Sequence, residues 1–320
     1  MIDSAAIAVG LIILFAGGEA TLRGSVSLAK TLGVSAAMIG LVVVGFGTSA
    51  PELVVTLRAS LGGQPDIGVG NVVGSNIANI LLVIGIGAIV YPLTCEARAI
   101  RRTGTMMLGV SILLVALALN GRVGAIEGGF MVAALICFLA WSYVRDRRHQ
   151  TASAKLHSRE ADEPGDLPLS VFRITIYLVF GLAALIGGAA LLVEGATGIA
   201  RSFGVPESVI GLSLIAIGTS LPEVAATVVA AIRRHTDVAI AGILGSNIFN
   251  VLGILGVAAL VKPLPVANDI ASIDIWVMLA ASLVILPILF SGLRVSRQEG
   301  VVLLVLYVSY ISSMALRLPG

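Results

Sequence analysis

The stretch "GFGTSAPE", residues 45 to 52, places a glutamate directly after a proline inside an apolar run, and it returns as "AIGTSLPE", residues 216 to 223. A carboxylate inside a membrane span is energetically expensive and marks a functional position by default. Proline lacks a backbone donor and clashes with the carbonyl four residues earlier, so the helices are expected to break near Gly47 and Gly218. Carbonyls freed at such breaks must face protein, water or an ion.

The surrounding composition is that of an integral membrane protein. Of 320 residues, 58% are hydrophobic and only 12% are charged, whereas soluble proteins carry about 25% charged residues. Apolar stretches near the roughly 20 residues needed to cross a bilayer recur along the whole chain. We count ten of them, centred near residues 14, 46, 80, 112, 134, 185, 217, 250, 282 and 308. The fold class expected is therefore an all-α membrane protein with ten transmembrane helices.

The chain also repeats itself. Residues 33 to 92 align without a gap with residues 204 to 263, with 23 identities in 60 positions, where chance gives about 5. Five spans separate equivalent helices, and because five is odd the second copy enters the membrane from the opposite side. We expect two inverted five-helix repeats, 1–144 and 171–320, with their motifs at 40–92 and 211–263, joined by a linker at 145–170. Transporters of this kind bind substrate near the midplane, at the repeat interface.

The residues gathered by the repeats offer hard oxygen ligands. Each break supplies carbonyls, a threonine, a serine and a glutamate, and "GSNIAN" and "GSNIFN" place a serine and an asparagine on one helix face. Calcium takes six to eight oxygens in an adaptable cage, and two glutamates balance one divalent cation. Zinc or copper is not expected, since all three histidines lie in loops. The candidate ligands are Glu52, Glu223, Thr48, Thr219, Ser49, Ser220, Ser75, Ser246, Asn79, Asn250, Gly45 and Ala216.

Both repeats resemble the α-repeats of the cation/calcium antiporter superfamily, in particular the sodium/calcium exchanger branch in its short prokaryotic form. The resemblance implies that Glu52 and Glu223 hold calcium together with the carbonyls of Thr48 and Thr219. It further implies alternating access, in which the first and sixth helices slide over a fixed core. The sodium sites that it implies use Glu52, Glu223, Ser49, Ser220, Ser75, Ser246 and the carbonyls of Gly45 and Ala216.

Two departures bear on the coupling ion. Many relatives carry an aspartate at one of the positions held here by Asn79 and Asn250, so two asparagines argue against potassium coupling. The proton-coupled branch lacks this G-T-S-x-P-E form, which favours sodium over a calcium/proton or other cation/proton antiporter. A calcium channel with the same glutamates is a further alternative. An intramembrane hydrolase, and enzyme function generally, is not expected because the spans hold no Ser-His or Cys-His pair.

Energetics sets the expected stoichiometry. Expelling one calcium against a 10,000-fold gradient and 100 mV costs roughly 10 kcal/mol, and each sodium entering down a tenfold gradient returns about 3.7 kcal/mol. Three sodium ions per calcium therefore suffice where two do not, and transport is electrogenic.

The positive charges predict the orientation. Placing the N-terminus outside puts 15 of the 20 Lys and Arg residues in inner loops, as the positive-inside rule favours. Both termini are then outside and the 145–170 linker is cytoplasmic, in a multi-pass protein of the cell (inner) membrane. The expected partners are calcium, sodium and the lipid bilayer. No cofactor, nucleic acid or obligatory protein partner is expected.

Overall fold

The computed structural model describes residues 2–157, 170–204 and 218–315, and almost all of them are helical. Seven helices are long and apolar enough to cross a membrane, or eight if one bent pair counts as a span. The expected all-α membrane class is thus confirmed, whereas the number of ten spans stays a prediction. The span predicted near residue 217 falls largely outside the described residues. Five of the seven helices are α1 (Ile2–Leu32), α7 (Ala97–Leu119), α8 (Ala125–His157), α9 (Val171–Ser202) and α15 (Ile275–Gly292). A further long helix, α16 (Arg297–Ala315), follows them.

The bent pair contains the first motif. The segments α2 (Ala36–Ile39), η1 (Gly40–Val44) and α3 (Gly45–Thr48) run up to Ser49, and α4 (Ala50–Leu61) leaves it at an angle of 42°. Pro51 occupies the first turn of α4, where its missing N–H costs nothing. The predicted break near Gly47 is therefore confirmed within two residues. α12 (Leu221–Ile232) begins after Ser220, whose backbone angles of −89° and 1° match the −81° and 3° of Ser49.

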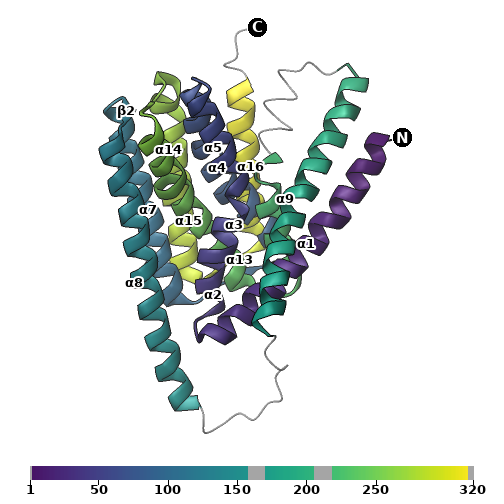
Figure 1. The fold of residues 1–320 in the computed structure, drawn as a ribbon, viewed down its shortest axis with the longest axis vertical. Helices are drawn as coiled ribbons and strands as arrows, with labels where there is room; N and C mark the ends of the chain where they lie inside the picture. Colours follow the sequence, from purple (N-terminus) through teal and green to yellow (C-terminus); the bar gives the residue numbers. More distant parts are fainter. Residues whose placement is uncertain (1, 158–169, 205–217, 316–320) are drawn as a thin grey trace.

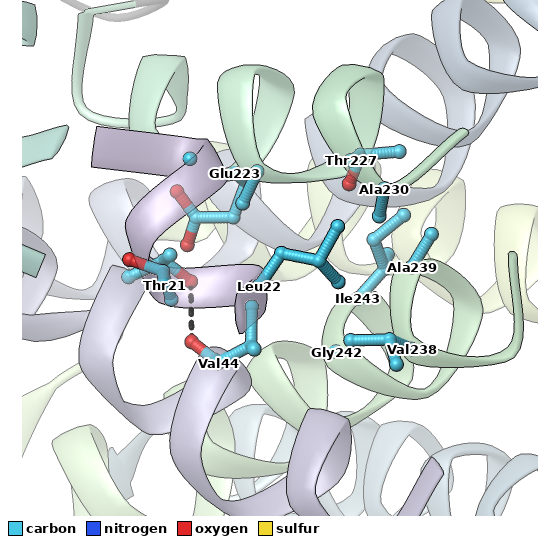
Figure 2. Close-up of a pocket in the computed structure, with 13 residues that line it drawn as sticks. Thr21, Leu22, Val44, Glu223, Thr227, Ala230, Val238, Ala239, Gly242 and Ile243 are labelled. Carbon is cyan, nitrogen blue, oxygen red and sulfur yellow. Dashed lines mark hydrogen bonds between the residues drawn. The ribbon is translucent and has the colours of Figure 1, made fainter. Parts of the chain in front are cut away.

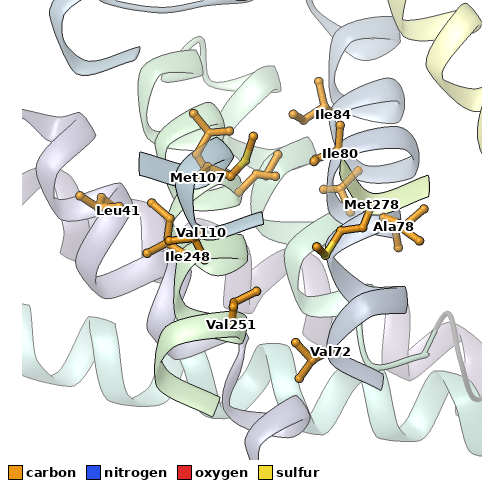
Figure 3. Close-up of a cluster of buried hydrophobic side chains, with 14 of the residues drawn as sticks. Leu41, Val72, Ala78, Ile80, Ile84, Met107, Val110, Ile248, Val251 and Met278 are labelled. Atoms are coloured by element: carbon orange, nitrogen blue, oxygen red, sulfur yellow. The ribbon is translucent and has the colours of Figure 1, made fainter. Parts of the chain in front are cut away.

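The second motif of each repeat lies in the two most buried spans. One consists of α5 (Pro65–Ala78), η2 (Asn79–Val83) and α6 (Ile84–Val90), and the other of α13 (Thr236–Ile248), η4 (Phe249–Leu255) and α14 (Gly256–Val261). The sequence did not predict η2 and η4, which are π-helical. Single π turns inside α-helices are frequent at functional sites. Side chains from both spans, including Ile80, Ile84, Ile248 and Val251, meet in the buried core that Figure 3 shows.

The two halves of the chain are interlocked at their edges. The strand β1 (Leu93–Thr94) pairs with β4 (Arg294–Val295), and β2 (Arg122–Val123) pairs with β3 (Leu264–Pro265). α6 packs on α16 and α14 packs on α8, so each half contributes its last helix to the other half. Ser111 on α7 and Ser282 on α15, 171 residues apart, lie 3.1 Å from one another between their hydroxyl oxygens.

α1 and α9 form an antiparallel pair beside this core (Figure 1). The beginning of α1 and the end of α16 lie at one end of the molecule. The end of α8 and the beginning of α9 lie at the other. α8 continues to His157, into the predicted 145–170 linker, and this end of α8 lies opposite the described ends of the chain.

Candidate ion-binding site

The two motif glutamates lie at the beginnings of α4 and α12, directly after the breaks. Glu52 is 0% exposed and Glu223 is 2% exposed. Helix N-termini favour negative charge, because the free N–H groups and the positive end of the helix dipole lie there. No Lys or Arg side chain forms an ion pair with either glutamate in the part of the chain that the structure describes. Each buried carboxylate thus lacks a basic partner, so a bound cation beside them would remove a large electrostatic cost.

Six side-chain oxygens around these glutamates are buried and lack a hydrogen-bond partner among the described residues. They are Glu52 Oε1 and Oε2, Glu223 Oε2, Asn79 Oδ1, Asn250 Oδ1 and Ser220 Oγ. Each buried polar group left without a partner costs about 1–3 kcal/mol. Native proteins seldom leave such a set unsatisfied unless an ion or water completes it. Six hard oxygens carrying two formal charges suit the coordination of calcium.

Ser246 connects the elements that bear these oxygens. Its hydroxyl donates to Glu223 Oε1 at 3.2 Å and accepts from Asn79 Nδ2 at 3.1 Å. Its Oγ also lies 2.6 Å from the Oγ of Ser49 at the first break. Ser246 therefore links α3, α12, α13 and η2, so both halves of the chain meet at this one hydroxyl.

The other predicted ligands have mixed surroundings. The hydroxyls of Thr48 and Ser49 donate back to the carbonyls of Val44 and Gly45, each at 2.9 Å. Ser75 is buried on α5. Thr219 lies in the turn that precedes α12, whereas Ala216 lies outside the described residues. Of the predicted side chains, the structure thus brings Ser49, Asn79, Ser246 and Glu223 into direct contact.

A narrow cavity reaches Glu223 from the side of α1. It has about 10 Å³ of space for the centre of a water-sized sphere, and Gly18, Thr21 and Leu22 of α1 line it together with Glu223 and Thr48. Figure 2 shows Glu223 and Thr21 among the residues that line this cavity. Thr21 Oγ1 is buried without a partner in the described part of the molecule. The sequence reasoning missed Thr21, because α1 lies outside the aligned repeat.

Sequence reasoning also missed Asn76 and Asn247, the first asparagines of "GSNIAN" and "GSNIFN". Both side chains are 2% exposed and lie directly behind the candidate ligands. Asn79 Nδ2 donates to Asn247 Oδ1 at 3.0 Å, and Asn250 Nδ2 donates to Asn76 Oδ1 at 2.9 Å. Their repetition at the 171-residue offset was the available signal.

No three Asp, Glu, His or Cys side chains converge on one metal position within the described ranges. Two buried carboxylates at helix breaks, surrounded by neutral oxygens, are typical instead of a membrane protein with a cation site in its core. The family model described as "Sodium/calcium exchanger protein" matches residues 4–144 and 173–315. The chain therefore belongs to the sodium/calcium exchanger family, whose members are membrane ion exchangers and not enzymes.

Relatives cover nearly the whole chain. The putative antiporter CaxA of Alkalimonas amylolytica is 36% identical over 305 residues, covering 94% of this chain and 95% of the relative. The sodium/calcium exchanger MaX1 of Methanosarcina acetivorans is 33% identical, covering 94% of this chain and 95% of the relative. A solved structure of the sodium-calcium exchanger NCX_Mj, soaked with sodium and strontium, matches with a TM-score of 0.81 and 30% identity, covering 98% of both chains.

Proposed function

We propose that this protein is a secondary antiporter that exchanges sodium for calcium across the membrane by alternating access. The observation that carries the proposal is the set of six buried side-chain oxygens around Glu52 and Glu223 that have no partner among the described residues. Carboxylate and carbonyl oxygens are the ligands that calcium and sodium prefer. The family supports the same pair of ions, since its related exchangers are named for sodium and calcium.

In this proposal the two glutamates bind the divalent ion from opposite halves of the chain. Glu52 and Glu223 supply the charge, and the backbone carbonyls of Thr48 and Thr219 complete the cage. Sodium ions take the same glutamates together with serine hydroxyls and the carbonyls of Gly45 and Ala216. One carboxylate pair then serves both ions in turn, which makes their binding mutually exclusive and couples the two fluxes.

The contacts between equivalent residues support inverted repeats. Asn76 and Asn247 each donate from Nδ2 to the other's backbone carbonyl, at 3.2 and 3.3 Å. Such reciprocal contacts between residues 171 apart are those produced by a twofold axis. We infer that this axis relates 1–144 to 171–320, lies in the membrane plane and passes beside the ion site, as in other transporters built this way.

We further propose that the protein exchanges three sodium ions for one calcium ion, so that each cycle moves one net charge and transport is electrogenic. We also propose the cell (inner) membrane as the location, with the termini outside and the linker cytoplasmic. Calcium/proton exchange is the competing function, since the partnerless oxygens of Glu52 would accept protons as well as cations.

The proposal is tested by calcium-45 uptake into proteoliposomes loaded with sodium, potassium or choline, with and without a pH gradient. We expect uptake that requires internal sodium, is lost in Glu52→Gln, and persists in the control Glu194→Gln, whose glutamate lies exposed on α9. Uptake driven equally well by a proton gradient would replace the coupling ion, and uptake unaffected by Glu52→Gln would refute the site.

A further inference from the structure

Behind the candidate ligands lies a ring of four buried asparagines whose amides are linked across the two halves. Asn76 Nδ2 donates to the backbone carbonyl of Asn247, and Asn247 Nδ2 donates to the backbone carbonyl of Asn76. Their side-chain oxygens accept from Asn250 and Asn79 respectively, at 2.9 and 3.0 Å. All four side chains are at most 2% exposed, so water does not compete for these groups.

The chemistry of the partners fixes the orientation of every amide in this ring. A backbone carbonyl only accepts hydrogen bonds, so the group that faces it from Asn76 or Asn247 must be the NH₂. The opposite side of each of these two amides then presents its oxygen. Asn250 and Asn79 must donate to these oxygens from their own NH₂ groups, which turns their Oδ1 atoms away from the ring. Those are the two amide oxygens that lack a partner among the described residues.

Two methionines hold the inner amides further. Asn76 Nδ2 lies 3.8 Å from the sulfur of Met278, and Asn247 Nδ2 lies 3.7 Å from the sulfur of Met107. Thioether sulfur is a weak acceptor, so it satisfies an N–H group and offers nothing to an amide oxygen. A rotated amide would place its oxygen against both a carbonyl and a sulfur. The inner pair is therefore locked, and the outer pair is locked through it.

We propose that Asn76 and Asn247 are positioning residues that hold Asn250 and Asn79 with their carbonyl oxygens toward the bound cation. The proposal rests on the proposed function and deepens it, because it explains why two amides act as neutral ligands. An amide free to rotate would present its NH₂ for part of the time, and that group carries positive partial charge. Ligands held in this way add no formal charge to the cage. Its two negative charges are those of the glutamates, and they balance one divalent ion.

The test is a double-mutant cycle read by equilibrium calcium-45 binding to purified protein. We expect Asn76→Leu and Asn250→Ala each to weaken calcium binding by about tenfold, or about 1.4 kcal/mol. The double variant should bind no more weakly than the weaker single variant, because Asn76 acts only through Asn250. Met131→Leu changes a buried methionine of α8 outside the asparagine ring and serves as the matched control.

Additive losses in the double variant, or unchanged binding in Asn76→Leu, would overturn the positioning role. The equivalent cycle of Asn247→Leu and Asn79→Ala provides the measurement if Asn76→Leu fails to fold. Wild-type protein that binds no calcium would instead refute the proposed function, so the two failures are distinguishable.

Discussion

Ser49 and Ser220 occupy equivalent breaks but have different surroundings. The Ser49 hydroxyl donates to Gly45 and contacts Ser246, whereas the Ser220 hydroxyl is buried without a partner among the described residues. Removing a buried hydroxyl that has no protein partner is nearly neutral for folding, because no bond is lost. Loss of the same hydroxyl from an ion cage weakens ion binding. Measuring the folding stability and the ion affinity of the same variant therefore distinguishes a structural hydroxyl from an ion ligand.

We accordingly expect Ser220→Ala to leave the melting temperature nearly unchanged while weakening calcium binding about tenfold, or about 1.4 kcal/mol. The control is Ser111→Ala, whose hydroxyl donates to Met107 and contacts Ser282 away from the glutamates. That variant should lower the melting temperature and keep calcium affinity. A Ser220→Ala protein with unaltered calcium binding would remove Ser220 from the site.

The surroundings of Cys95 predict how the reactivity of its thiol depends on pH. It lies between the spans that end at Val90 and begin at Ala97. Burial, with a contribution from the charge of Asp237, raises the pKa of its thiol to about 12. The thiolate is the reactive form, and at pH 8 it amounts to about one molecule in ten thousand.

In a Cys137→Ser background, we expect iodoacetamide to label native protein at pH 8 far more slowly than denatured protein. The rate should rise about tenfold per pH unit as pH increases toward the raised pKa. Equal labelling of native and denatured protein would contradict the burial of this thiol.

At the scale of the elements, α1 and α9 approach each other through glycines. A Cβ placed at Gly181 would lie 2.6 Å from the backbone nitrogen of Thr21, and one placed at Gly188 would lie 2.8 Å from that of Leu14. Small residues that let backbones approach are typical of membrane helix interfaces. Glu19 on α1 also pairs with Arg23 and with Arg233 after α12, at 2.8 Å in each case. α1 therefore packs closely against α9. Its contact with the core includes the exposed ion pair between Glu19 and Arg233.

Because the backbones of α1 and α9 are in close contact at Gly181, we expect Gly181→Ala to destabilise the protein by about 1–3 kcal/mol. The backbone of α1 must move to admit the added methyl group. Gly187→Ala is the matched control, since Gly187 is exposed on the same helix and a Cβ there meets nothing among the described residues. Thermal unfolding in detergent measures both variants. Equal melting temperatures would show that the two helices are less closely packed than the structure has them.

Sequence predicted the elements whose cause is local and missed those that depend on a distant partner. Pro51 and Pro222 determine the breaks by their own chemistry, and the burial of Glu52 and Glu223 followed from the apolar runs around them. The π turns at Asn79 and Asn250 have no such local marker. The roles of Asn76 and Thr21 depend on neighbours more than a hundred residues away, which a single sequence does not identify. The ligand roles inferred from the motifs stay predictions.

At the scale of the whole molecule, one end carries a cluster of basic residues. The end that contains the close of α8 and the start of α7 gathers Arg98, Arg101, Arg102 and Arg145 around one cleft of about 760 Å³. The described start of α1 lies at the opposite end (Figure 1). The positive-inside rule favours a cytoplasmic position for this cleft, which is the orientation proposed above.

The orientation is tested with reporters fused after residue 320. We expect alkaline phosphatase there to be active and green fluorescent protein to be dark, because both would be exported. Insertion of the same reporters between residues 158 and 169 should reverse the pattern. Fluorescence from the C-terminal fusion would invert the topology proposed here.

The crossed strand pairs have a consequence for how the chain is assembled. β1 finds its partner in β4 and β2 finds its partner in β3, so neither half alone can satisfy the exposed backbone edges that it carries. A ribosome that has finished only the first half has therefore produced an open intermediate, with the surface for α16 still bare on α6. Completion of that surface must wait for the last helix to be made.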